Sequence, residues 1–262
     1  MMSSSAIPLV LLLATIVKGH GGGMHYIIDG VIHDGYDSRV RNNEKGTIQR
    51  SWTWDSIPWE ENEWWSNIPA LTCGANGTAW EKSYHAPHRA GSIVSINYTH
   101  PELPDYRFGH QHGPMCAYLA ACPDEGCEKV DIHAPIWFKI FEKGLKNGTW
   151  LDGYWYMKDV ESGANLDVQT PKSLRPGKYL LKHDMHNLET GFNQYFTNCV
   201  QLDISGEGDK LPAKEKLVSF PQAYDKDWGV SFPPKGSGAE WFYTKKNNEV
   251  VYPLPGPPIW EG

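Results

Sequence analysis

The chain has 262 residues and a formal net charge of −7 at pH 7, and an acidic chain of this kind has no electrostatic reason to bind nucleic acid. Its 12 Trp, 13 Tyr, 19 Pro and 26 Gly are typical of a loop-rich β protein with many aromatic side chains. The longest apolar run, Ile7 to Val17, is shorter than the roughly 20 residues that cross a bilayer, so we expect no membrane span.

The first nineteen residues have the pattern of a secretory signal peptide, because the early apolar run ends at Lys18-Gly19. A small residue such as Gly19 suits the cleavage site, and cleavage there makes His20 the first residue of the mature chain. Cleavage after Gly21 or Gly22 is the alternative. The sequence therefore predicts a secreted, extracellular protein.

The segments after the signal peptide favour β structure. Short, partly alternating segments separated by Gly and Pro turns indicate strands, and no window shows a clean helical stripe. This pattern predicts an all-β fold, an antiparallel β-sandwich with long loops, in one domain over residues 20–232. The predicted strands are Met24–Ile28, Gly91–Tyr98, Pro114–Leu119, Ile136–Phe141, Gly177–Asp184 and Cys199–Ser205.

Two segments stand apart from the predicted strands. Ser51–Trp65 carries many Trp and acidic residues and is expected to form a surface loop, with a short helical turn as an option. Residues 233–262 form an irregular, Pro-rich tail that either wraps the sandwich or extends from it.

The cysteines and the glycosylation sequons also fit an exported protein. Five cysteines suit two disulfides with one thiol left over, although the sequence alone does not fix the pairing. Asn-x-Ser/Thr sequons at Asn76, Asn97 and Asn147 are compatible with a secreted glycoprotein.

A mature N-terminal His20 offers a metal both an α-amine and an imidazole nitrogen from one residue. A second histidine from a distant loop would complete a T of three nitrogens around one metal. Nitrogen ligands with open positions suit copper, whereas zinc prefers a tetrahedral site with a fourth ligand. His20 therefore predicts one mononuclear copper ion.

Several sequence blocks run in one order from His20 to about residue 230. They include His20-Gly21, Tyr26–Val31, Leu71–Gly74, Gly113–Ala120, Trp137–Ile140, Pro176–Asp184, Gln194–Leu202 and Val218–Tyr224. Each block alone is a weak signal, but the ordered set resembles the fungal cellulose-active lytic polysaccharide monooxygenases of auxiliary-activity family nine, formerly glycoside hydrolase family sixty-one.

The resemblance implies an immunoglobulin-like β-sandwich with a flat copper face that cleaves β-1,4-glucan oxidatively at C1, C4 or both. It implies O₂ or H₂O₂ as co-substrate, an external small-molecule or protein electron donor, and a monomer that binds cellulose or a related β-glucan. It also implies a disulfide between Cys73 and Cys199. Cys122 and Cys127 are close enough in sequence for a local disulfide, and Cys116 is then the buried free thiol.

The second copper histidine of the family stands shortly before Gly-Pro, most often with one residue between, and here that position is Gln111. A shift of one residue makes either His110 or His112 the ligand, and we favour His110 because His112 adjoins the Gly-Pro turn. His100 is a weaker candidate.

The family pattern around the copper changes in two further places. Gln194 occupies the usual Gln position, where it would orient the oxygen species, but Phe196 replaces the usual Tyr. Glu189 falls where a His is usual, and His186 could substitute for that His through a shifted loop. A Glu can help to position oxygen only when protonated, or it can act as an acid–base group. Tyr224 is expected to be an exposed aromatic that helps to hold the glucan.

Two alternatives stay open beside an active monooxygenase. The altered residues around the copper favour a copper-binding protein of the same fold with little or no oxidative activity. The Trp-rich Ser51–Trp65 segment favours a carbohydrate-binding sandwich in which His20 has no role. The sequence decides neither the attacked carbon nor the exact polysaccharide.

Overall fold

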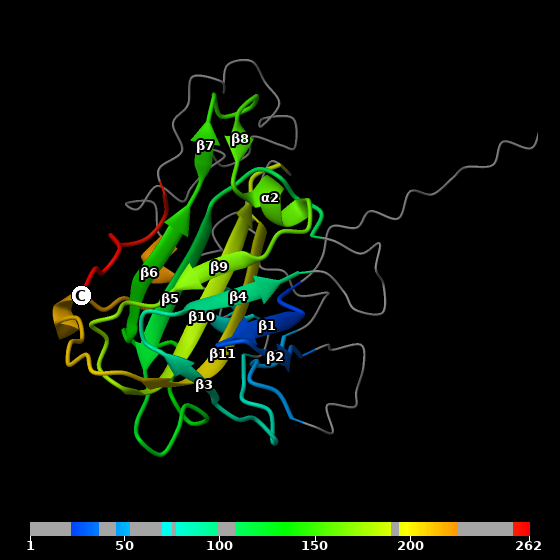
Figure 1. The fold of residues 1–262 in the computed structure, drawn as a ribbon. Coiled ribbons are helices and arrows are strands. Elements are labelled where there is room, and N and C mark those ends of the chain that lie inside the picture. Colours follow the sequence, from blue (N-terminus) through cyan, green and yellow to red (C-terminus); the bar gives the residue numbers. More distant parts are fainter. Residues whose placement is uncertain are drawn as a thin grey trace, which may run out of the picture.

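The computed structural model describes residues 22–36, 46–52, 70–74, 77–98, 108–189, 194–224 and 254–262. Two stacked β-sheets form its body (Figure 1). The smaller sheet has the order β2-β1-β4-β9 and the larger has the order β3-β11-β10-β5-β6. Every pairing in the two sheets is antiparallel except that of β3 with β11. The predicted β-sandwich is therefore confirmed, with one parallel pair added.

The elements have the following bounds. The smaller sheet consists of β1 (His25–Ile28), β2 (Val31–Asp34), β4 (Ile93–Asn97) and β9 (Leu166–Gln169). The larger sheet consists of β3 (Ala86–Arg89), β5 (Met115–Ala121), β6 (Trp137–Lys143), β10 (Gly177–Asn187) and β11 (Gln194–Ser205). A separate hairpin pairs β7 (Leu145–Asn147) with β8 (Tyr154–Trp155). The helical elements in the described ranges are α1 (Ala70–Cys73), α2 (Met157–Glu161) and the 3₁₀ turns Lys214–Lys216 and Gln222–Tyr224.

A two-residue turn joins β1 to β2. Asp29 has φ 46° and Gly30 has φ 83°, and Ile28 pairs directly with Val31. Positive φ at both central residues is the geometry that Asp-Gly favours in a hairpin. The turn thereby fixes the register of the first strand that follows the N-terminal segment.

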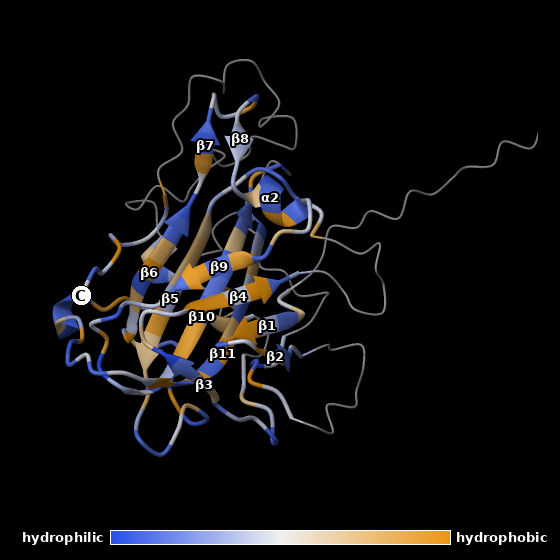
Figure 2. Cartoon of the chain, in the orientation of Figure 1, coloured by the Kyte–Doolittle hydropathy of each residue, from blue (hydrophilic) through white to orange (hydrophobic). Residues whose placement is uncertain are grey.

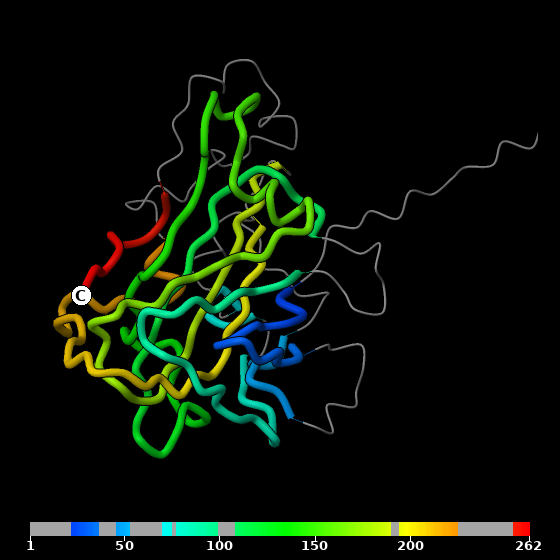
Figure 3. The backbone as a smooth tube through the Cα atoms, in the orientation of Figure 1, coloured from blue at the N-terminus to red at the C-terminus, as the bar shows by residue number. Residues whose placement is uncertain are grey.

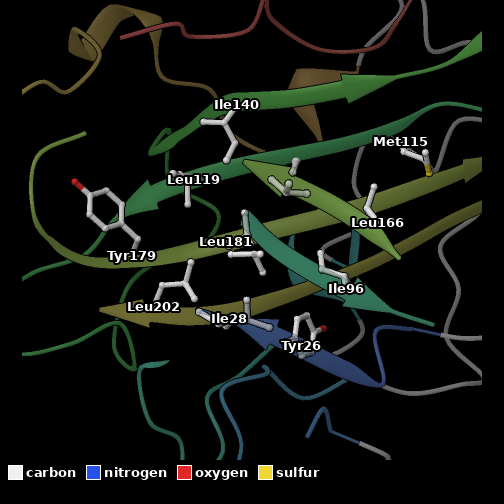
Figure 4. Close-up of a cluster of buried hydrophobic side chains, with 14 of the residues drawn as sticks. Tyr26, Ile28, Ile96, Met115, Leu119, Ile140, Leu166, Tyr179, Leu181 and Leu202 are labelled. Atoms are coloured by element: carbon white, nitrogen blue, oxygen red, sulfur yellow. The ribbon is translucent and has the colours of Figure 1, made fainter. Parts of the chain in front are cut away.

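The main core lies between the two sheets (Figure 4). Tyr26 and Ile96 of the smaller sheet contribute to it, together with Leu181 and Leu202 of the larger sheet, and all four side chains are buried. Strand β4 is mostly apolar, and β9 alternates buried apolar with exposed polar residues (Figure 2). Burial of these strands stabilises the sandwich at roughly 25 cal/mol per Å² of apolar surface.

A second buried cluster covers the outer face of the larger sheet, where β10 presents every second side chain. Leu181 and Met185 of β10 belong to the core between the sheets. Lys182 and Asp184 alternate with them and lie on the outer face, where the Lys182 ammonium sits over the Phe220 ring and pairs with the Asp184 carboxylate. Because the two faces alternate, each residue of β10 belongs to one side of the sheet only.

Two disulfides cross-link the chain, and both predicted pairings are confirmed. Cys73 of α1 is bonded to Cys199 of β11 across 126 residues, and Cys122 is bonded to Cys127 in a local loop. Cys116 is a buried free cysteine, as expected.

The segment 254–262 packs along β6, an outer strand of the larger sheet, and the chain trace shows it at that edge (Figure 3). The Trp260 backbone N–H donates to the Lys139 carbonyl at 2.8 Å, and the Trp260 ring packs edge-on against Phe138. The last residues therefore wrap the sandwich and protect an edge strand. None of the helices in the described ranges is long and apolar enough to cross a membrane.

Candidate functional site

Three segments meet at one end of the larger sheet, and one of them, the start of β5, is far from the other two in sequence. Asn187, the last residue of β10, pairs with Gln194, the first residue of β11, and Met185 pairs with Met115 at the start of β5. The loop before β5 is held to β10 because the Leu188 N–H donates to the His112 carbonyl at 3.1 Å. The register of three strands thus brings the predicted histidines next to the end of β10.

Gly113 explains why this loop lies so close to β10. It has φ 147°, and a β-carbon there would collide with the backbone carbonyl of His186. A residue with a side chain is therefore strained in this position and would push the loop away from the strand. The Gly-Pro step that marks the motif in the sequence has this packing role in the structure.

The Glu189 carboxylate binds both candidate histidines. Its Oε2 lies 3.0 Å from Nδ1 of His110, and its Oε1 lies 2.6 Å from Nδ1 of His112. The backbone N–H of Gln111 donates to Oε1 at 3.1 Å. All three side chains at this centre are largely shielded, with exposed fractions of 12% for His110, 21% for His112 and 16% for Glu189.

The charge of Glu189 follows from these contacts. Burial alone raises the pKa of this carboxyl, but hydrogen bonds from His110, His112 and the Gln111 backbone outweigh burial and lower the pKa to about 2. Glu189 is therefore ionised near neutral pH and only accepts hydrogen bonds. An ionised Glu189 cannot donate a hydrogen bond to oxygen, so of its two expected roles that of an acid–base group is the one left open.

Asn187 connects Glu189 to Gln194. Its Nδ2 donates to Oε1 of Gln194 at 2.7 Å, and its Oδ1 accepts the Glu189 backbone N–H at 2.9 Å. Asn187 itself is fully buried, and both contacts are partly buried. The buried amide thereby fixes the orientation of the half-buried Gln194 side chain.

An aromatic wall stands beside His110. The Phe196 ring is buried, and its centroid lies 5.2 Å from that of His110 and 5.0 Å from that of Phe108, with the two phenyl rings edge to face. Phe108 packs on His110 as well, at 5.6 Å. The His110 imidazole is thus held by two phenyl rings and a carboxylate.

Comparison with known proteins identifies the family. The model of Auxiliary Activity family 9 (formerly GH61) matches residues 20–236. The chain belongs to this family. Its members among the relatives described below are lytic polysaccharide monooxygenases or a monooxygenase-like protein.

Curated relatives and a solved structure are similar over most of the chain. An AA9 family lytic polysaccharide monooxygenase-like protein, CEL1 of Agaricus bisporus, is 28% identical over 95% of this chain and 73% of its own length. AA9 family lytic polysaccharide monooxygenase B of Heterobasidion irregulare is 29% identical over 97% of this chain and 99% of its own. The crystal structure of HiLPMO9B matches with a TM-score of 0.73 and 27% identity, over 93% of this chain and all of that chain.

Two residues that the family pattern suggested lie elsewhere. His186 is fully buried on the outer face of the larger sheet, with its ring 4.7 Å from that of Tyr195 and 4.8 Å from that of Tyr224. Asn187, the next residue, points to the opposite face and binds Gln194, so His186 does not replace the usual family His. The expected role of His186 is wrong because successive side chains of a strand point to opposite faces, and His186 lies on the face away from the site.

Tyr224 is not an exposed sugar-binding residue either. Its side chain is fully buried, and its hydroxyl donates to Oδ2 of Asp184 at 2.6 Å. Burial is the largest cause that raises the pKa of this phenol well above its usual value. Tyr224 therefore stabilises the outer-face cluster and does not contact a glucan.

The first expected metal ligand, His20, and the weaker candidate His100 both lie outside the described residues. The described part of the chain contains no group of three His, Cys, Asp or Glu side chains placed to hold a metal ion. The structure does place the start of the described chain: the Gly23 backbone N–H donates to Oδ1 of Asn198 at 2.9 Å.

Phe108, Asn187 and the double histidine contact of Glu189 are features of the site that the sequence reasoning missed. Phe108 stands two residues before His110, a position that could have drawn attention to it. No sequence signal marked Asn187, because its partners are set by strand register.

Proposed function

We propose that this member of the AA9 family is a secreted, copper-dependent lytic polysaccharide monooxygenase that cleaves a β-1,4-glucan such as cellulose. The protein's copper would be held by the α-amine and imidazole of His20 and by His110. Residues 1–19 would be removed as a signal peptide, and the mature protein would act as a monomer.

The observation that carries this proposal is the position of His110 relative to the entering chain. His110 packs on Phe196, and Gly23 is bonded to Asn198 two positions further along β11. Side chains at positions i and i+2 of a strand share one face and lie about 7 Å apart. Two residues of chain also span up to about 7 Å, so from Gly22 the N-terminal residue can reach His110.

The donors at the site fit copper. A carboxylate that takes Nδ1–H of an imidazole leaves Nε2 as the nitrogen with a lone pair, which is the usual arrangement of a metal-binding histidine and its supporting carboxylate. Nitrogen ligands of this kind suit Cu²⁺, which has the highest affinity in the divalent series. When bound, copper would supply one-electron redox chemistry with O₂ or H₂O₂ and an external reductant.

The surrounding residues would position the oxygen co-substrate. Gln194 has its Oε1 engaged by Asn187, so its Nε2 is the group that can donate to a bound oxygen. Phe196 keeps the space beside His110 dry and offers no phenol. Glu189 remains an acceptor and holds the histidine in place.

The direct test is incubation of the secreted protein with cellulose, ascorbate and stoichiometric copper, followed by mass spectrometry of released oligosaccharides. We expect oxidised ends, and the masses distinguish oxidation at C1 from oxidation at C4. His110→Ala should abolish the products, whereas His85→Ala, a histidine beside Glu128, should not. The absence of oxidised products from copper-loaded protein that begins at His20 would contradict the proposal.

A second candidate function is copper binding without turnover. It is favoured by Glu189, which as a carboxylate cannot donate a hydrogen bond to oxygen. Tight copper binding together with no ascorbate-driven H₂O₂ production would select this alternative.

A further inference from the structure

We infer that Glu189 is a positioning residue that holds both His110 and His112 in the Nδ1–H tautomer, so that both imidazoles, and not one of them, present Nε2 to the site. The inference rests on the proposed function, because it states how Glu189 orients the histidines that would bind the metal. It assigns His112 a place in the site beside His110.

The geometry requires both rings to donate. A carboxylate has no proton to give, so each contact between Glu189 and an Nδ1 atom must be an N–H···O bond donated by the imidazole. The third donor is the backbone N–H of Gln111, which lies between the two histidines in sequence. Three convergent donors from three consecutive residues thus wrap one carboxylate.

The backbone that carries Glu189 is anchored by two further hydrogen bonds. The Glu189 backbone N–H is bonded to the Asn187 side chain, and the N–H of Leu188 is bonded to the carbonyl of His112. Backbone and side-chain hydrogen bonds therefore join the same two segments. Because Glu189 and the loop that carries the two histidines are joined in this way, Glu189 can fix the orientation of each imidazole ring as well as its tautomer.

A glutamine at position 189 cannot treat the two histidines alike, as the two carboxylate oxygens of Glu189 do. Its amide has one oxygen and one NH₂ group, so it can accept from only one Nδ1–H, and it presents a donor to the other ring. That second ring must then accept through Nδ1 and carry its proton on Nε2. Glu189→Gln should therefore change the tautomer of one histidine while it preserves the size of the side chain.

The test is a long-range ¹H–¹⁵N spectrum of the metal-free, full mature protein at neutral pH, with His110→Gln and His112→Gln used to assign the two rings. We expect both rings of the wild type to be Nδ1–H tautomers, and one of them to change in Glu189→Gln. Glu128→Gln removes a carboxylate beside His85, 3.7 Å away, and is the matched control that should change neither ring. Glu189→Asp tests whether a shorter carboxylate restores the pattern.

Copper titration by calorimetry gives a second readout. We expect Glu189→Gln to weaken copper binding by about 10- to 100-fold, the usual effect of removing a supporting group of a metal ligand. An Nε2–H tautomer at either ring of the wild type, or an unchanged pattern in Glu189→Gln, overturns the inference and leaves the copper proposal standing. The expected tautomers in a protein that binds no copper support the positioning role and overturn the proposed function alone.

Discussion

His183, near the middle of β10, has a hydrogen-bond partner at each ring nitrogen. The Tyr26 hydroxyl lies 3.0 Å from Nε2, and the Tyr98 hydroxyl lies 2.7 Å from Nδ1, all within the core between the sheets. A neutral imidazole offers one donor and one acceptor, so one tyrosine accepts and the other donates. Burial is the main reason why the pKa of His183 falls to about 3.

The first prediction concerns the pH dependence of stability. Unfolded His183 takes up a proton below about pH 6.5, whereas the folded residue stays neutral down to a pKa of about 3. The unfolded state therefore binds more protons, so this contribution to stability is fully present above pH 6.5 and is lost as the pH falls. We expect the loss to be about 3 kcal/mol at pH 4, measured by denaturant unfolding.

One variant tests this assignment. His183→Gln keeps one donor and one acceptor but does not titrate, so its unfolding free energy should fall less between pH 6.5 and pH 4 than that of the wild type. Equal slopes in His183→Gln and the wild type would rule out His183 as the cause.

The second prediction concerns Tyr224. Tyr224→Phe removes one of the donors to the buried Asp184 carboxylate, and we expect the free energy of unfolding to fall by about 1–3 kcal/mol. Tyr154→Phe removes a similar bond to Asp159 near the surface and should cost less. Affinity for cellulose should be unchanged in both, and weaker binding by folded Tyr224→Phe would contradict its placement in the interior.

Among the strands, those predicted from the sequence are the ones that alternate or are rich in apolar residues. The six predicted segments correspond to β1, β4, β5, β6, β10 and β11. The shorter strands escaped prediction because pairing with neighbours defines them: β3 (Ala86–Arg89) contains Pro87 and lies at an edge, and β8 has only two residues. Such strands carry too few residues for a pattern to show.

The third prediction concerns the β7–β8 hairpin and its sequon. Asn147 is exposed at the end of β7, so its side chain is accessible to glycosylation. Asn97 in β4 is half-buried, and its Nδ2 donates to Asn165 at 2.8 Å. Peptide mass spectrometry of protein secreted from a eukaryotic host should therefore find the glycan at Asn147 and little or none at Asn97. A glycan at Asn97 and none at Asn147 would contradict this prediction.

The sequence predicts site residues that lie in one strand better than contacts between distant segments. Gln194 and Phe196 were assigned by counting back from Cys199, and all three residues lie in β11, so the count meets no insertion. His186 was misplaced because the sequence does not say which face of β10 turns toward the site. The contact of Glu189 with two histidines joins segments almost 80 residues apart, 79 for His110 and 77 for His112, and no local pattern encodes such a pairing.

For the whole molecule, the two disulfides close loops of very different length. Cys73–Cys199 spans 126 residues and joins α1 to β11, an inner strand of the larger sheet, whereas Cys122–Cys127 spans 5. In the chain-entropy account, a cross-link stabilises more when it closes a longer loop, by about 5 kcal/mol for the first and about 2 kcal/mol for the second.

The fourth prediction follows from this difference. We expect the double variant Cys73→Ala/Cys199→Ala to lose more unfolding free energy than Cys122→Ala/Cys127→Ala, by about 2–3 kcal/mol. Guanidinium unfolding of both variants under identical conditions measures the difference. An equal loss would mean that local packing around each bridge, and not loop length, sets its contribution.

The central claim is that the mature N-terminus at His20 completes a copper site with His110. Electron paramagnetic resonance of the Cu²⁺-loaded protein tests it most directly, with mature protein that begins at His20 compared with a form that retains Gly19. We predict a tetragonal copper signal with nitrogen coupling in the first form. In the second form, and in His110→Ala, we predict a different spectrum and weaker binding, because each lacks one of the three nitrogens. The same copper spectrum in all three proteins would contradict the account.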